Sequence, residues 1–139
     1  MSIVLDHTIV PAHDKLAAAK FFAEIFGLHC GEPYGPFVPV AINEHTTFDF
    51  DDRRKPVEVH HYAFQVSPSE FDAIFGRVQA KGLKHGSGPY SNEDMRVGEF
   101  NGGRVVYFRE LGGHLLEIRT KTSAADIAAM RHSPIYSAA

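Results

Sequence analysis

The sequence predicts an α+β fold in which a module of one strand, one helix and three strands (βαβββ) occurs twice in tandem. Three observations predict it. Each half of the chain opens with an alternating, strand-like segment, and each of these leads into a Phe-rich amphipathic helix pattern. A histidine and a Gly-Leu pair also recur at matched positions: His7 precedes Gly27-Leu28 by 20 residues, and His61 precedes Gly82-Leu83 by 21. Such matched spacing indicates a duplicated structural unit.

The first module is expected over about residues 3–51. Its opening strand, residues 3–10, alternates and is rich in β-branched side chains. A helix is predicted from Lys15 to Phe26 by its apolar spacing, and Gly27 is a natural stop. Strand-like segments follow at about 38–42 and 46–51.

The second module is expected over about residues 57–120, after a charged linker at 52–56 (DRRKP). Its strand at 57–66 is followed by Pro68, which suits the start of a helix, and the helix is expected to run from about residue 69 to 80. Strands are predicted at 104–109 and 114–120, each after a glycine turn. The polar segment 86–98 is predicted to be a functional loop. The tail, 121–139, lies outside the repeat, with a short helix expected at 124–131.

Length, charge and composition limit the class of protein. At 139 residues the chain suits a single domain, and its net charge of −3 argues against a nucleic-acid-binding surface. One cysteine, Cys30, excludes an internal disulfide and favours a reducing, cytoplasmic setting; no partner base identifies it as a nucleophile. The opening MSIVLDHTIV lacks a signal-peptide pattern, and no apolar run is long enough to span a membrane.

Strand alternation places four metal-ligand candidates on one side of the predicted sheet. In the last strand Leu116 and Ile118 are expected in the core, so Glu117 points the other way, and Asp49 is related to Phe48 and Phe50 in the same manner. The alternation of the opening strands gives the same face to their histidines. Four side chains would therefore lie on the face that the helices leave uncovered: His7, Asp49, His61 and Glu117.

This set of side chains suits a catalytic metal. Imidazole and carboxylate groups bind divalent Fe, Mn, Ni or Zn, and three protein ligands leave positions open for substrate. The alternative for each histidine is a hydrogen-bonded structural role. We give that structural interpretation to the remaining histidines, which are His13, His29, His45, His60, His85, His114 and His132. Among them, His45 and His60 are the candidates to hydrogen-bond a metal-binding side chain.

Three segments resemble the vicinal oxygen chelate superfamily, which includes glyoxalases, bleomycin-resistance proteins and extradiol dioxygenases. LDHTIV is similar to its opening strand, HHYAFQV to its second-module strand, and GRVVYFRELGGHLLEI to its closing hairpin. The resemblance covers about residues 3–120. It implies a curved mixed sheet around an open cup with helices outside, metal ligands at His7, His61 and Glu117, and a homodimer. Glyoxalase I-like members imply Asp49 as a fourth ligand.

The resemblance also directs attention to Tyr107, ten residues before Glu117, where extradiol dioxygenases carry an active-site tyrosine. The sequence departs from the family pattern in three ways. The histidine that extradiol dioxygenases carry upstream of the tyrosine is absent from residues 97–100, and the usual Asp-Pro of the closing turn is Glu110-Leu111. In addition, Asp49 is shorter than the usual glutamate of the fourth strand.

The expected function is a metal-dependent enzyme that acts on a small oxygen-rich or aromatic substrate, by lyase or isomerase chemistry or as a ring-cleaving dioxygenase. Glu117 and Tyr107 are the candidate catalytic residues, and Glu117 or Asp49 would serve as a base after leaving the metal. Segment 86–98 would close the pocket. The alternative is a metal-free, drug-binding protein of the bleomycin-resistance type.

Overall fold

A computed structural model describes residues 2–100 and 102–120. The chain divides into two compact units. The first comprises Met1–His61 together with Arg109–Leu115, and the second comprises Tyr62–Phe108 and the chain from Leu116 onward. The two units are therefore interleaved in the sequence, and each is described here by itself. The helix expected at 124–131 lies outside the described residues.

The first unit contains one helix and a three-stranded sheet. Its elements are β1 (His7–Pro11), α1 (Lys15–Phe26), β2 (Val38–Ala41) and β3 (Thr47–Asp51), and the sheet order is β1-β3-β2. β1 runs parallel to β3, and β2 runs antiparallel to it. The helix begins where Asp14 Oδ1 accepts hydrogen bonds from the amides of Leu16 and Ala17. It ends at Gly27 in the left-handed conformation, with φ 70°.

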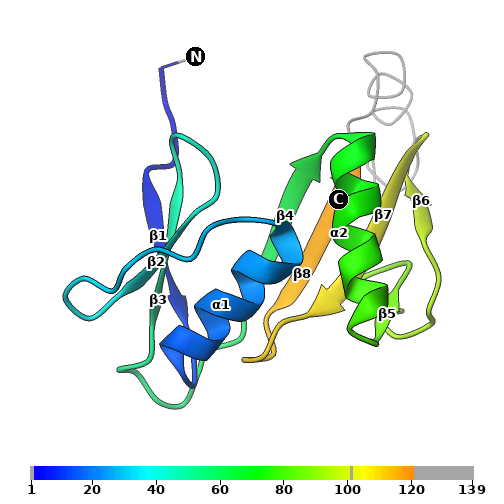
Figure 1. The fold of residues 1–139 in the computed structure, drawn as a ribbon. Coiled ribbons are helices and arrows are strands. Elements are labelled where there is room, and N and C mark those ends of the chain that lie inside the picture. Colours follow the sequence, from blue (N-terminus) through cyan, green and yellow to red (C-terminus); the bar gives the residue numbers. More distant parts are fainter. Residues whose placement is uncertain (1, 101, 121–139) are drawn as a thin grey trace, which may run out of the picture. The chain divides into compact units, whose positions relative to one another are not determined.

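Helix α1 lies beside the strands of its sheet (Figure 1), and aromatic side chains form the core between them. The ring of Phe22, on the buried face of α1, lies 5.3 Å from the ring of Phe48 and 5.8 Å from that of Phe50. The register pairs Phe50 with Val10 on one side and Val38 on the other, so the helix-facing side of the sheet is apolar. Alternation then places His7, Ile9, Asp49 and Asp51 on the opposite face, which was the face predicted for His7 and Asp49.

The second unit contains one helix and a five-stranded sheet. Its elements are β4 (His61–Val66), α2 (Pro68–Ala80), β5 (His85–Gly86), β6 (Gly98–Phe100), β7 (Gly103–Arg109) and β8 (Leu115–Thr120). The sheet order is β4-β8-β7-β5, and β6 also pairs with β7. A capping box starts α2: Ser67 Oγ accepts from the Glu70 amide at 3.1 Å, and Glu70 Oε1 accepts from the Ser67 amide at 2.8 Å.

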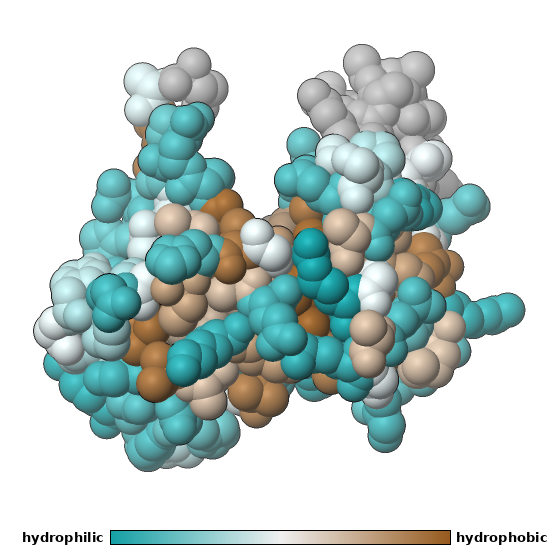
Figure 2. All heavy atoms as spheres, viewed as in Figure 1, coloured by the Kyte–Doolittle hydropathy of each residue, from teal (hydrophilic) through white to brown (hydrophobic). Residues whose placement is uncertain are grey.

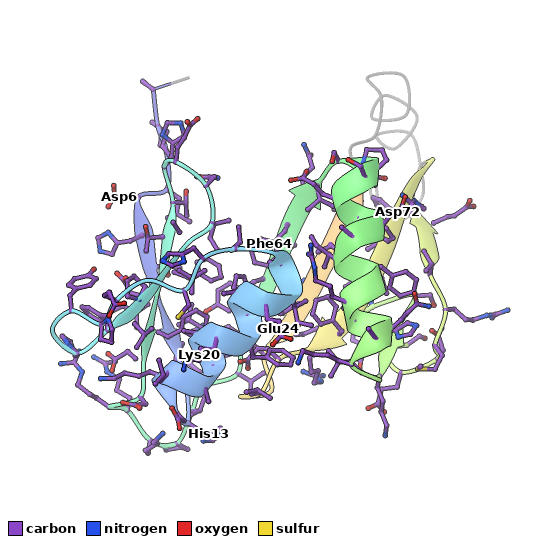
Figure 3. The ribbon with its side chains drawn as sticks, in the orientation of Figure 1. Asp6, His13, Lys20, Glu24, Phe64 and Asp72 are labelled. Atoms are coloured by element: carbon purple, nitrogen blue, oxygen red, sulfur yellow. The ribbon has the colours of Figure 1, made fainter. Side chains whose placement is uncertain are left out.

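The core of the second unit lies between α2 and β7 and β8 (Figure 1). Its buried apolar side chains are Phe71, Ile74, Val78, Val106, Phe108, Leu116 and Ile118. Arg104 contacts the edge of this core through two interactions with α2. Its guanidinium carbon Cζ lies 4.3 Å from the centroid of the Phe71 ring. Its Nη1 atom lies 2.7 Å from Oδ1 of Asp72, which is labelled on α2 in Figure 3.

The α+β class and the position of both helices are confirmed. The module pattern differs in detail, because the first unit has two strands after its helix, where three were expected. Segment 30–37 contributes only the isolated bridges Cys30–Val40 and Tyr34–Phe37. In the second unit the predicted loop 86–98 carries a short strand at each end, β5 and β6, both antiparallel to β7.

Two opening strands are shorter than predicted. β1 begins at His7 because its partner β3 begins at Thr47, and Ile3 is 82% exposed. β4 begins at His61, not at residue 57, because the His60 amide donates to the Nδ1 atom of His114 and not to a neighbouring strand. Side-chain hydrogen bonds thus replace the strand ladder there.

No helix within residues 2–100 and 102–120 is both long and apolar enough to cross a membrane. The space-filling view shows hydrophobic residues in scattered groups among hydrophilic ones on the side that it presents (Figure 2). Scattered exposed apolar residues are normal on protein surfaces.

Candidate functional site

His7 stands at the start of β1 with its imidazole fixed by a neighbour. Its Nδ1 atom lies 2.8 Å from Oδ2 of Asp6, which precedes the strand (Figure 3). The hydrogen bond to Asp6 and the charges of Asp6 and Asp49 hold the pKa of His7 above its usual value. His7 and Asp49 therefore act on each other electrostatically from the same face of the first sheet.

Asp49 occupies the middle of β3 and is only 2% exposed. The hydroxyl of Tyr34 lies 3.3 Å from each of its carboxylate oxygens. Desolvation and the charge of Asp49 raise the pKa of the Tyr34 hydroxyl, so it stays protonated and remains a donor. Tyr34 thus orients the carboxylate, and its place in a loop gave no sequence signal for this role.

His61 is the first residue of β4, and its ring is also oriented by the backbone. Its Nδ1 atom lies 3.0 Å from the carbonyl oxygen of Leu115. That oxygen can only accept, so Nδ1 carries the proton of the neutral ring, and the lone pair is on Nε2. In His7, too, Nδ1 faces an acceptor, the carboxylate of Asp6, so Nδ1 carries a proton.

Glu117 and Tyr107 line one pocket, which lies wholly within the second unit. The pocket has a volume of about 430 Å³, within the range of small-molecule sites. It lies on the sheet face opposite the core residues Leu116 and Ile118. The side chains around it are Ser87, Pro89, Glu99, Phe100, Val105, Tyr107, Glu117 and Arg119.

Arg119 is the pocket residue that the sequence analysis missed. Its Nη1 atom lies 3.7 Å from Oε2 of Glu117, and its guanidinium lies 4.5 Å from the centroid of the Phe100 ring. The sequence did contain a signal for it, because Arg119 is two residues after Glu117 on the same strand and so shares its face.

The structure describes the predicted site residues in three places. Of the predicted ligands, His7 shares a sheet face with Asp49, and His61 is hydrogen-bonded to the Leu115 carbonyl. Glu117 lines a pocket together with Tyr107, the other candidate catalytic residue. Within residues 2–100 and 102–120, no three His, Cys, Asp or Glu side chains form a group that could hold a metal ion.

The hydrogen bonding of the two histidines fits a metal-ligand role. A histidine that binds a metal through one nitrogen commonly donates its other N–H to a carboxylate or a carbonyl group. His7 and His61 each make this bond through Nδ1. The Nε2 atom of a neutral imidazole is a donor that suits divalent Fe, Mn, Ni or Zn.

His114 shows the opposite arrangement. It is fully buried, its Nδ1 accepts from the His60 amide at 2.9 Å, and its Nε2 donates to the carbonyl of Pro11 at 2.7 Å. Both ring nitrogens are thereby used, so its structural assignment agrees with the structure. His45 and His60 lie near Glu44 and Glu58, at 3.3 and 3.5 Å. His132 lies outside the described residues.

Comparison with known proteins finds similar chains among the solved structures. The sequence matches no family model and no curated protein. Among solved structures, Oxidase ChaP-H2 is 44% identical, with a TM-score of 0.83, over 89% of this chain and 98% of that one. Oxidase ChaP-H1 is 42% identical, with a TM-score of 0.82, over 86% and 97%.

A more distant structure shows the same fold. Lactoylglutathione lyase from Agrobacterium tumefaciens is 20% identical, with a TM-score of 0.65, over 86% of this chain and 94% of that one. Together with the sequence motifs and the α+β architecture, these comparisons establish that the chain belongs to the vicinal oxygen chelate superfamily, with the two ChaP-H oxidases among its relatives.

Proposed function

We propose that this protein is a divalent-metal-dependent enzyme that oxidises a small, oxygen-rich aromatic substrate. The observation that carries the proposal is the 44% identity to Oxidase ChaP-H2 over almost the whole of that chain. The name of that relative favours oxidative chemistry, including ring cleavage by a dioxygenase, over the lyase or isomerase alternatives. The metal-binding part of the proposal rests on the superfamily resemblance and on the orientation of two histidines.

The proposed ligands are His7 and His61, through Nε2, and the carboxylate of Glu117. Asp49 is the candidate fourth ligand. A bound divalent ion would supply Lewis-acid polarisation of substrate oxygens. The Nδ1 hydrogen bonds of His7 to Asp6 and of His61 to the Leu115 carbonyl would hold each ring in the orientation needed for binding.

The pocket residues would bind and position the substrate. Tyr107 would place a phenolic hydroxyl against a substrate oxygen, and Phe100 would offer an aromatic face to a planar ring. The segment 86–98 contributes Ser87 and Pro89 to the lining. Asp94 holds this segment, because its carboxylate accepts from the amides of Ser87 and Arg96 at 3.0 Å each and from the Ser87 hydroxyl.

Metal analysis tests this proposal. Protein reconstituted in separate samples with Fe(II), Mn(II), Ni(II) and Zn(II), then dialysed, should retain about one equivalent of at least one metal. Because each residue supplies one of few ligands, H7A, H61A and E117A should each lose most of it. D49N tests the fourth position, and H13A, which alters an exposed histidine, is the matched control.

Two results would contradict the proposal. Less than about a tenth of an equivalent of any metal after reconstitution would favour a metal-free binding protein of the bleomycin-resistance type. A full equivalent in H61A would remove His61 from the ligand set. With the metal identified, oxygen consumption on a panel of aromatic hydroxy compounds separates an oxidase or a dioxygenase from an isomerase or a lyase, which consumes no oxygen.

A further inference from the structure

Among the described residues that line the second-unit pocket, Arg119 is the one with a positively charged side chain. Its guanidinium carbon Cζ lies over the Phe100 ring, 4.5 Å from the ring centroid. A guanidinium carries its N–H donors in the plane of the group, where they can meet the two oxygens of a planar acceptor edge-on. The pocket therefore presents hydrogen-bond donors beside aromatic side chains.

The partner of Arg119 within the pocket is Glu117, and their contact is a loose one. The distance from Nη1 to Oε2 is 3.7 Å, which is an ion pair but too long for a hydrogen bond. The Glu117 side chain is 7% exposed and that of Arg119 is 33% exposed. The charges are thus balanced inside the pocket while the guanidinium remains accessible from it.

We propose that Arg119 is a specificity residue that binds the carboxylate of a planar aromatic acid, and that Glu117 is the internal counter-ion which this carboxylate replaces. The fork of a guanidinium matches the two oxygens of a carboxylate, whereas the present contact with Glu117 does not use that geometry. The aromatic part of the ligand lies beside Phe100 and Tyr107. This inference rests on the proposed function in treating the ligand as a substrate and, for the link to metal binding alone, in treating Glu117 as a metal ligand.

Replacement of Glu117 by the ligand carboxylate at Arg119 would link ligand binding to metal binding. In the metal-free protein Glu117 competes with the ligand for Arg119. If Glu117 served as a metal ligand, as proposed above, the ion would offset its charge and Arg119 would be left to the ligand. Metal binding and carboxylate binding would then favour each other, as linkage requires.

Two nearly isosteric probes test the inference: 2-naphthoate, which is an anion, and 2-naphthamide, which is neutral. Because the chain has no Trp, naphthalene fluorescence can be followed with little protein background. Binding is measured on the full chain, with its metal content determined, before and after treatment with a chelator. The variants are R119Q, R119K and E117Q, and R96Q is the control because Arg96 is exposed and does not line the pocket.

Substitutions at Arg119 and Glu117 should change the affinity for 2-naphthoate in opposite directions. R119Q should weaken 2-naphthoate binding roughly 10- to 100-fold and change 2-naphthamide binding by less than about twofold, because only the anion loses charge-assisted hydrogen bonds. R119K should fall between, since it keeps the charge and loses the fork. In chelator-treated protein E117Q should tighten 2-naphthoate binding about two- to fivefold by removing the competing carboxylate.

Three results would overturn the inference. These are a wild-type protein that does not bind 2-naphthoate, an R119Q effect of equal size on both probes, and an E117Q variant that binds 2-naphthoate no better than wild type. An equal effect on both probes would mean that Arg119 only supports Phe100. If the chain binds no metal and yet gives the expected pattern, the metal-dependent function fails while the role of Arg119 stands.

Discussion

His114 is a buried residue that makes hydrogen bonds to three parts of the first unit. Its ring donates through Nε2 to the Pro11 carbonyl in β1 and accepts through Nδ1 from the amide of His60. Its backbone amide donates to Glu110 Oε1 at 3.0 Å. A ring that accepts at one nitrogen and donates at the other must be neutral. The residue therefore contributes to stability by satisfying two partly buried backbone groups, the His60 amide and the Pro11 carbonyl.

Replacing His114 should be costly. H114A leaves the Pro11 carbonyl and the His60 amide without their partner and creates a cavity, so we expect a loss of about 2–4 kcal/mol in the free energy of unfolding. Urea denaturation followed by circular dichroism measures it. H13A, which removes an exposed ring, should change the free energy by less than about 0.5 kcal/mol. Equal effects of H114A and H13A would refute the structural role.

At the scale of elements, α2 contains a glycine that its conformation does not require. Gly76 lies inside the helix, and a Cβ built there has no atom within 4 Å. Gly82, just after the helix, also has open space around it, but its φ is +66°. The two positions therefore differ in backbone conformation and not in crowding.

Alanine substitutions should separate these effects. G76A should stabilise the protein by about 0.5–1 kcal/mol, because alanine loses less backbone entropy in a helix. G82A should destabilise it by about 1–2 kcal/mol, because a Cβ is disfavoured in the left-handed region. Thermal unfolding of both variants against wild type measures the two shifts. Shifts of the same sign would contradict the conformational explanation.

The elements that could be predicted from sequence are those governed by local signals. Helix α1 has its apolar spacing and its terminal Gly27 in the sequence, and alternation correctly separated Phe48 and Phe50 from Asp49. The short strands β5 and β6 were missed because they form only by pairing with β7. The only sequence feature that marks these strands is a glycine in each, Gly86 and Gly98. A Cβ on Gly86 would collide with the Ser91 carbonyl, and one on Gly98 with the Ser87 carbonyl.

The candidate site was predictable to a similar extent. Periodicity and the superfamily resemblance selected His7, Asp49, His61 and Glu117. The group that orients His7 is its sequence neighbour Asp6. No local signal predicted the groups that orient His61 and Asp49, because the carbonyl of Leu115 and the hydroxyl of Tyr34 reach them from distant parts of the chain. Arg119 was overlooked for a different reason, since its role depends on the aromatic ring of Phe100 in another strand.

At the scale of the whole molecule, the chain does not divide at the linker 52–56 as two independent modules would. Arg109–Leu115, which connects β7 to β8 in the second half of the sequence, belongs to the first compact unit. The ring of His114 connects this segment to β1 by a hydrogen bond to the Pro11 carbonyl. The linker is also hydrogen-bonded to the first unit, because Lys55 Nζ donates to the carbonyls of Ala12 and His13 at 3.0 and 2.9 Å.

This interleaving predicts that cutting the linker will not release the N-terminal half. With the recognition sequence of a site-specific protease inserted between Arg54 and Lys55, the cleaved protein should elute as one species in native size-exclusion chromatography and show both fragments on a denaturing gel. The expected reason is that residues 109–115, on the C-terminal fragment, remain packed in the first unit. The same cleavage in H114A should release more of the N-terminal fragment, because the bond to Pro11 is lost. Complete separation of the fragments after cleavage of the otherwise unaltered chain would mean that the two halves fold as independent modules.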